Sequence, residues 1–240
     1  MQNRYTGDIG DYGKLGLLRV LQNEGLNIGV NWYLVPDETH NGDGRHIQYL
    51  TNETVGRCDM TLWTELNHIV SSGERAVSAL QKDSILKAAF YSEPLDFTGE
   101  SRTGRDEKRK TWHNAALNLL RGTDILFVDP DNGVLVPSAK GTRRENKFVR
   151  TEELEAYYRD GSSVIYYQHK ARRPDAFYSE QHANILRKIN LNETNGLALK
   201  FRTTSQRYYF FIMQPCHIET INAAVRRMLA SEWSNHFSIL

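Results

Sequence analysis

Two aspartates on either side of a proline, in the turn Asp129-Pro130-Asp131-Asn132, form the most chemically suggestive group in this sequence. They follow four apolar residues, 125–128, which are typical of a buried strand. The proline fixes the turn and removes a backbone donor, so we expect Asp129 to point into the crevice where the strand ends. Carboxylate and amide oxygens there can accept hydrogen bonds from an amino group, hold a divalent metal or act as a base.

A second candidate loop, residues 36–46, follows the predicted strand Ile28–Val35. Its two glycines would let the backbone approach a ligand, and its acids and histidines would supply polar contacts. The glycine spacing is neither that of a dinucleotide-binding fingerprint nor that of a P-loop. The residues of this loop that we expect near a ligand are His40, Gly42, Asp43, Gly44 and Arg45.

Two further segments carry charged residues next to predicted elements. His169 and Lys170 follow the buried strand Val164–His169, where the histidine could serve as a base and the cations could hold phosphate. Near the start of the chain, Asp11 is expected to cap a helix that Lys14 enters, facing either solvent or the crevice. Glycines at positions 7, 10, 13 and 16 predict either close backbone packing or a ligand in this segment.

Basic residues gather in two stretches on either side of the Asp129 turn. We expect them either to form a rim that tracks the phosphates of RNA or DNA or to be a solvated face. One stretch comprises Arg102, Arg105, Lys108, Arg109 and Lys110, and the other comprises Lys140, Arg143, Arg144 and Lys147.

The elements that position these groups alternate between strand and helix. Runs of β-branched and aromatic residues predict strands, and apolar residues at helical spacing predict helices between them. This order predicts an α/β fold, Rossmann-like, with a mostly parallel sheet flanked by helices. The last two strands, Leu197–Arg202 and Tyr208–Gln214, are close enough to form a C-terminal antiparallel hairpin. In an open α/β sheet ligands bind at the carboxyl ends of the strands, so the loops named above are expected to meet.

Length and composition narrow the class of protein. The 240 residues predict a single α/β domain, 1–240, with a helical insertion around 51–86. The net charge of +1 does not indicate a partner, and no apolar run is long enough to cross a bilayer. The first residues lack the apolar core of a signal peptide, and two distant cysteines suit a reducing compartment. We therefore expect a cytoplasmic protein that does not bind membranes. The sequence does not indicate its oligomeric state.

Three of these segments resemble motifs of the adenine-N6 ribosomal-RNA methyltransferases of the RlmJ type, which belong to the Rossmann-like superfamily that uses S-adenosylmethionine. That family has Asp-x-x-Lys entering its first helix, similar to Asp11 and Lys14 here. Its cofactor loop, Asp-Thr-His-Ala-Gly-x-Gly-Arg, is similar to residues 38–45, and its catalytic turn, Asp-Pro-Pro-Tyr, stands where residues 129–132 stand here.

The resemblance implies that S-adenosylmethionine contacts Lys14, His40, Gly42 and Gly44. It also implies that Asp129 and the Pro130 carbonyl accept hydrogen bonds from a substrate amino group. Two features depart from the family. Asn132 replaces the aromatic residue that stacks on the flipped base, and no acid at the end of a second strand is evident to hold the cofactor ribose. Either the substrate is not adenine, or the scaffold does something else.

Three functions therefore remain open from the sequence. The first is a methyltransferase-like enzyme acting on nucleic acid or a nucleotide. The second is an Mg²⁺-dependent nuclease in which Asp129 and Asp131 hold the metal and Lys170 positions water. The third is a non-catalytic nucleic-acid-binding module of the same fold.

Overall fold

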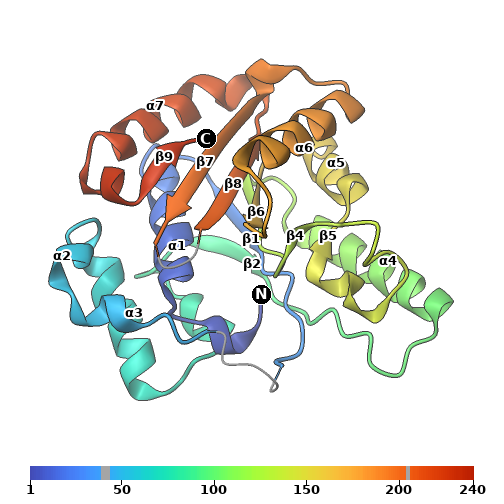
Figure 1. Ribbon diagram of the computed structural model, residues 1–240, viewed down its shortest axis with the longest axis horizontal. Coiled ribbons are helices and arrows are strands. Elements are labelled where there is room, and N and C mark those ends of the chain that lie inside the picture. The colour runs from blue at the N-terminus through green and yellow to red at the C-terminus, as the bar shows by residue number, and fades with distance from the viewer. Residues whose placement is uncertain (39–43, 204–205) are drawn as a thin grey trace.

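The computed structural model describes residues 1–38, 44–203 and 206–240, and is built around a seven-stranded sheet of order β2-β1-β3-β6-β8-β7-β9 (Figure 1). Strands β1, β2, β3 and β6 are parallel, and β8 runs antiparallel between β6 and β7. This arrangement confirms the predicted α/β, Rossmann-like fold with its mostly parallel core and C-terminal antiparallel hairpin. A further strand, β9, pairs with β7 and was not predicted. The strands are β1 (Ile28–Asn31), β2 (Ala88–Tyr91), β3 (Ile125–Val128), β4 (Gly133–Val134), β5 (Phe148–Val149), β6 (Ser163–His169), β7 (Gly196–Arg202), β8 (Gln206–Ile212) and β9 (Phe237–Ile239).

Helices cover both faces of this sheet, as a parallel sheet requires. Helices α1, α3 and α7 share one buried apolar cluster with one face, while α4, α5 and α6 share a second cluster with the other face. The helices are α1 (Ile9–Gln22), α2 (Glu53–Gly56), α3 (Met60–Ser72), α4 (Arg102–Leu119), α5 (Thr151–Arg159), α6 (Asp175–Lys188) and α7 (Ile218–Leu229). Short 3₁₀ helices lie at Asn3–Tyr5, Gln48–Thr51, Val77–Leu80, Arg143–Lys147, Glu193–Asn195, Pro215–His217 and Glu232–Asn235.

The alternation of side chains along the strands decides which polar residues can meet. Phe127 on β3, Ile165 on β6 and Tyr209 on β8 belong to the cluster on the α1 side. Their even-numbered neighbours Val128 and Tyr166 belong to the cluster on the α4 side. Because successive residues of a strand point to opposite faces, odd-numbered residues at the carboxyl ends of β3 and β6 approach α1.

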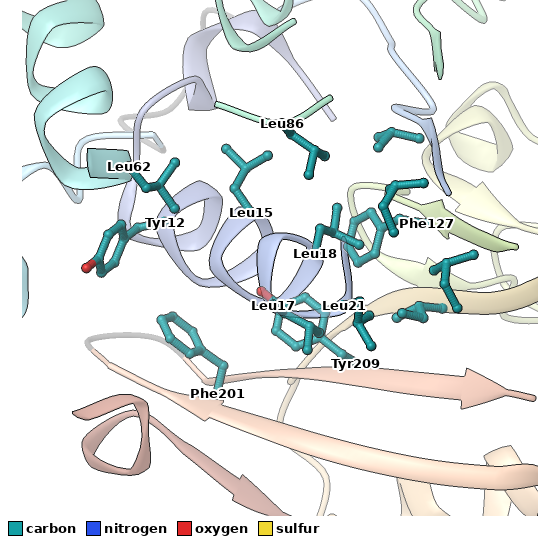
Figure 2. Packing of buried hydrophobic residues seen from close by; sticks show 14 of the residues in the cluster. Tyr12, Leu15, Leu17, Leu18, Leu21, Leu62, Leu86, Phe127, Phe201 and Tyr209 are labelled. Atoms are coloured by element: carbon teal, nitrogen blue, oxygen red, sulfur yellow. The ribbon is translucent and has the colours of Figure 1, made fainter. Parts of the chain in front are cut away.

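Helix α1 lies in the middle of its cluster and is buried along most of its length (Figure 2). Its N-cap is Asp8, whose carboxylate accepts hydrogen bonds from the Gly10 and Asp11 backbone amides. The prediction that Asp11 caps this helix is therefore wrong. The helix begins at Ile9, whereas the apolar residues at helical spacing begin at Leu15, and this displaced the predicted start. Asp11 instead lies in the first turn, and its side chain accepts a hydrogen bond from the Gly7 amide.

Three glycines let α1 pack closely against the strands and the C-terminal region. A Cβ at Gly10 would lie 2.8 Å from Cζ of Arg207, and one at Gly13 would lie 2.7 Å from the Phe201 ring. Gly16 meets the Trp233 ring in the same way. Of the two readings that the sequence left open for these positions, close packing is the one that the structure supports.

The segment between β1 and β2 is helical from residue 53 to 72, in α2 and α3. It adds the buried side chains of Leu62, Leu66 and Ile69 to the core beside α1. The strand that follows, β2, pairs in parallel with β1 at the edge of the sheet.

The close fit at Gly13 gives a stability prediction. Gly13→Ala should lower the free energy of unfolding by about 1–3 kcal/mol, because the added methyl group overlaps the buried Phe201 ring. Urea unfolding followed by circular dichroism measures the change. The matched control is Gly104→Ala in α4, where the nearest atom is the end of the flexible Glu100 side chain. There alanine should be neutral or stabilising by up to about 1 kcal/mol. Equal stability of Gly13→Ala and the wild type would contradict the packing argument.

Candidate functional site

A cavity of about 280 Å³ lies where the turn after β3 and the end of β6 meet the first turn of α1. Five segments line it: the first residues of the chain, the start of α1, residues Gly44 and His46, the turn 129–132, and the adjoining ends of β6 and β8. This is the carboxyl edge of the parallel strands, where open α/β folds bind ligands. The loops selected from the sequence therefore converge in their described parts.

The centre of the site is a buried ion cluster. The Lys14 ammonium lies 2.5 Å from Oδ2 of Asp129 and 2.9 Å from Oδ1 of Asp11. All three side chains are almost entirely buried. Burial lowers the pKa of Lys14, but the two carboxylates raise it by more, so it lies above its usual value and the side chain is cationic. Lys14 faces the crevice rather than solvent.

Asp11 titrates differently from an ordinary aspartate. Burial raises its pKa, the Lys14 ammonium lowers it, and the Asp8 and Asp129 carboxylates raise it again, to about 6. Two carboxylates, Asp11 and Asp129, thus share one close cation. The cluster therefore has one more carboxylate than it has ammonium groups. Protonation of Asp11 removes this excess negative charge.

Asp131 is directed to the chain's own first residues. Its Oδ1 lies 2.7 Å from the Met1 amino group, and its Oδ2 accepts a hydrogen bond of 2.6 Å from Gln2. The same amino group donates to the Asp129 and Tyr33 carbonyl oxygens. Burial raises the pKa of Asp131, but the Met1 amino group and the Gln2 hydrogen bond lower it by more, so it lies below its usual value. Asp131 therefore anchors the turn to the amino-terminal segment.

Asn132 stabilises the turn through hydrogen bonds of its backbone groups. Its amide donates to the Lys147 carbonyl oxygen at 3.0 Å, and its carbonyl accepts from Gln168 at 3.1 Å. The other end of the Gln168 carboxamide accepts from the Val134 amide. Gly133, with φ +97°, leaves no room for a Cβ beside that carboxamide. These contacts hold the turn in place above the end of β6.

The sequence did not point to Arg207, which lines the cavity from β8. In the antiparallel register Arg207 lies opposite His169, and Tyr209 lies opposite Tyr167. These four residues therefore share the α1 face of the sheet, and His169 and Tyr167 also line the cavity. The pairing of β6 with β8 brings Arg207 to this place, and this pairing cannot be read from the sequence.

The predicted cofactor loop is described only in part. His40, Gly42 and Asp43 lie outside the described residues. Gly44 lines the cavity with φ +83°, and its Cα faces the Arg4 carbonyl so closely that no side chain would fit. Arg45 is exposed and is not among the residues that line the cavity, whereas His46 is.

The nuclease alternative names Asp129, Asp131 and Lys170, and of these only the two aspartates line the cavity. Lys170 comes directly after β6, and its ammonium lies 2.6 Å from Asp175. The Asp175 carboxylate also contacts Lys200 and Tyr208. Asp129 and Asp131 each face a different cation of the chain. Among the described residues, no group of three or more histidine, cysteine or acidic side chains could hold a metal ion. Lys170 is not among the residues that line the cavity with Asp129 and Asp131, and the nuclease alternative stays a prediction.

Of the predicted basic rim, Arg109 is not at the surface. It is 1% exposed, forms a two-pronged ion pair with Glu153 at 2.6 and 2.7 Å, and donates to the Glu145 and Phe148 carbonyls. Its assignment to a phosphate-tracking surface is therefore wrong, because the guanidinium joins α4 to α5 and to residues 145–148, at the end of the loop after β4. Lys147 pairs with Glu38 at 2.5 Å and lies 3.8 Å from Asp131. The exposed members of the two stretches are Arg102, Lys108, Lys110, Lys140, Arg143 and Arg144.

Comparison with known proteins gives little beyond the fold. No family model matches the sequence, and no curated protein matches it. A solved structure, protein LPL1258 of Legionella pneumophila str. Philadelphia 1, described with the family model DUF519, shares 10% sequence identity. The match covers 98% of this chain and 96% of that chain, with a TM-score of 0.46. Within the described residues, no helix has the length and apolar character needed to cross a membrane.

The pKa of Asp11 predicts how stability depends on pH. Its value of about 6 in the folded protein lies above the ordinary value of 3.8, so the folded state binds its proton more tightly than the unfolded state does. This contribution is fully present below pH 4 and is lost as the pH rises to about 6. Asp11→Asn, which resembles the protonated form, should lack that loss. Wild type should therefore lose stability relative to Asp11→Asn between pH 4.5 and 6.5.

Urea unfolding of both proteins across this range is the measurement. The comparison of the two is needed because buried His182, whose pKa is lowered by burial to about 4, makes stability rise over the same range in both. As a control, Asp160→Asn at the surface should give a difference from wild type that does not vary between pH 4.5 and 6.5. If the free energies of unfolding of wild type and Asp11→Asn differed by a constant amount across this range, Asp11 would already be ionised at pH 4.5.

Proposed function

We propose that this protein is a methyltransferase-like enzyme that uses S-adenosylmethionine and acts on nucleic acid or a nucleotide. The observation that carries the proposal is convergence on one cavity. The start of α1, the end of the loop after β1 and the turn after β3 are the three segments that resemble methyltransferase motifs, and each contributes residues to its wall. The sheet, parallel with an antiparallel hairpin at one side, also has the layout of the methyltransferase variant of the Rossmann fold.

The chemistry of the cavity wall suits this cofactor. S-adenosylmethionine supplies an electrophilic methyl group and carries an ammonium, a carboxylate and a sulfonium. The wall combines the carboxylates of Asp8, Asp11 and Asp129 with the cations of Lys14 and Arg207. Such a mixed set can bind a ligand that bears both signs of charge.

Asp129 is the residue we assign to the substrate. It is 3% exposed, lines the cavity and is held by Lys14 at the end of β3. In this role it and the Pro130 carbonyl accept hydrogen bonds from a substrate amino group and orient its nitrogen lone pair. Lys14 is a positioning residue, since its contact keeps the Asp129 carboxylate directed and its charge balanced.

Of the two departures from the resembling family, one has a counterpart in the cavity wall. Asn132 cannot stack on a base, but the rings of Tyr5 and Tyr167 line the same cavity, and tyrosine faces stack on bases. An acid at the end of a second strand is supplied by Glu93, two residues after β2, the neighbour of β1. Glu93 is exposed, and its carbonyl accepts a hydrogen bond from Trp112. Glu93 is not among the residues that line the cavity, so no contact with the cofactor is assigned to it.

A basic surface near the cavity would bind the phosphates of a nucleic acid. At the start of α4, Arg105 donates to the Gly141 carbonyl oxygen, so this helix and the basic loop after β4 lie side by side. That loop ends at Lys147, which lies 3.8 Å from Asp131. Exposed Arg143 and Arg144 are positioned on this loop, where they would contact phosphates. A cytoplasmic location fits this function.

Binding of S-adenosylmethionine tests the proposal. Isothermal titration should show saturable binding, and Asp129→Asn should lower methyl transfer to RNA, DNA or nucleotides at least about a hundredfold while cofactor binding stays within a few fold. The control Asp160→Asn, in an exposed pair with Arg121, should keep full activity. Absence of binding at millimolar cofactor would remove the proposal. Binding without any methyl transfer would favour the non-catalytic module.

The basic loop gives an independent prediction. Replacing Arg143 and Arg144 together by glutamate should weaken binding to RNA or DNA and lower the slope of log K against log salt by about 2, because two phosphate contacts are lost. Fluorescence anisotropy at several salt concentrations measures both quantities. The control is Arg226→Glu on α7, far from this loop in Figure 1 and equally exposed. If the control weakens binding as much as the loop variant, the loop is not the contact surface.

A further inference from the structure

Arg109 and Arg207 are both buried, but their donors are satisfied very differently. Arg109 is 1% exposed and uses three nitrogens in bonds of 2.6–2.8 Å to Glu153 and two backbone carbonyls. Arg207 is 7% exposed, and among the described residues its Nη1 has no hydrogen-bond partner. A buried guanidinium with unsatisfied donors is costly, so Arg207 requires an explanation that Arg109 does not.

Among the described residues, Arg207 has an ion pair with Asp8 that is too long for a hydrogen bond. Oδ2 of Asp8 lies 3.9 Å from Nη2, beyond hydrogen-bond distance. Asp8 does not depend on this contact, because its other oxygen already accepts from two amides of the first turn of α1. Tyr167, whose hydroxyl accepts a hydrogen bond from the guanidinium, is neutral. Within the described part of the chain, the charge of Arg207 is therefore paired only at 3.9 Å, with Asp8, and without a hydrogen bond.

The other cation of the cavity wall differs in this respect. Lys14 is held by Asp129 and Asp11 at 2.5 and 2.9 Å, so it has no need for an added anion. Arg207 lines the same cavity next to Tyr167 and opposite His169. An anion that enters the cavity thus meets an under-satisfied guanidinium at the β8 side and fully paired charges at the β3 side.

We propose that Arg207 is the recognition site for an oxyanion, a phosphate or a carboxylate group, of the ligand that fills this cavity. The guanidinium fork suits both groups. The cavity volume of about 280 Å³ is at the lower end for small-molecule sites, which fits a single nucleotide or one part of a cofactor. In either case the oxyanion binds at the β8 side, and the opposite end of the ligand lies towards Asp129.

This inference rests on the proposed function only in naming the ligand. If the enzyme transfers methyl groups, the oxyanion is either the phosphate of the substrate or the carboxylate of S-adenosylmethionine. Both share the same chemistry at Arg207, and binding experiments separate them.

The first experiment compares small anions. Thermal unfolding is measured with inorganic phosphate, acetate or chloride at tens of millimolar and matched ionic strength. Phosphate or acetate should raise the midpoint of the wild type relative to chloride by RT ln(1 + [L]/Kd) linkage, and should raise that of Arg207→Gln by clearly less. Because general salt effects act on both proteins alike, the difference between them isolates the site. Equal shifts in both proteins would overturn the proposal.

The second experiment identifies the source of the anion. Isothermal titration compares AMP with adenosine, and S-adenosylmethionine with its decarboxylated form, on the wild type. In one pair, the member that carries the phosphate or carboxylate group should bind at least about tenfold more tightly, and Arg207→Gln should remove that preference. Arg207→Lys, which keeps the charge, should retain part of it. Arg202→Gln, an exposed arginine on β7 of the same hairpin, should leave it unchanged.

The outcomes separate this inference from the proposed function. If S-adenosylmethionine binds but neither pair shows a preference for the anion, the methyltransferase proposal stands and the role of Arg207 is wrong. If S-adenosylmethionine does not bind but phosphate or AMP binding depends on Arg207, the oxyanion site stands and the methyltransferase proposal falls. Circular dichroism of Arg207→Gln and Arg207→Lys establishes that each variant is folded before its binding is interpreted.

Discussion

The ion cluster of Lys14 with Asp129 and Asp11 is the interaction that the site depends on. It joins the first helix to the turn after β3, two segments separated by 115 positions in the chain. Three buried ionised groups cannot be left apart, because each would carry a desolvation cost that only a partner offsets. The cluster therefore fixes the position of α1 along the sheet as well as the direction of the Asp129 carboxylate. Burial, together with the neighbouring Asp8 and Asp129 carboxylates, outweighs the Lys14 ammonium and raises the pKa of Asp11 to about 6.

The packing of α1 is adapted to that cluster. Glycines on one side of the helix allow it to approach Arg207, Phe201 and Trp233, so that Lys14 reaches the end of β3 while the helix remains in the core. Leucines on its other sides fill the space towards α3 and the sheet (Figure 2). A helix with larger residues at these positions would stand further from the strands, and the ammonium would no longer meet both carboxylates.

A second constraint is the alternation of side chains along the strands. It sends Asp129, Tyr167, His169 and Arg207 to the α1 face, and it sends Gln168 and Tyr208 to the other face. The carboxamide of Gln168 is used to hold the turn after β3, and Tyr208 binds Asp175 together with Lys170. Residues that are adjacent in the sequence thus serve separate purposes, one set at the cavity and the other in holding the structure around it.

The sequence by itself determined the class of fold and the edge of the sheet at which the cavity lies. Apolar runs followed by turn residues identified β3 and β6, and the short connection between β7 and β8 required a hairpin, because these signals are local. It also identified Lys14 and Asp129 as candidates, since charged residues beside buried elements are few. Only the tertiary structure decided their roles. It paired Lys14 with Asp129, turned Asp131 towards the amino-terminal segment, placed Arg109 in the interior and brought Arg207 to the cavity. These outcomes depend on strand register, on which face each residue occupies and on contacts between distant segments, and no local pattern of residues encodes them.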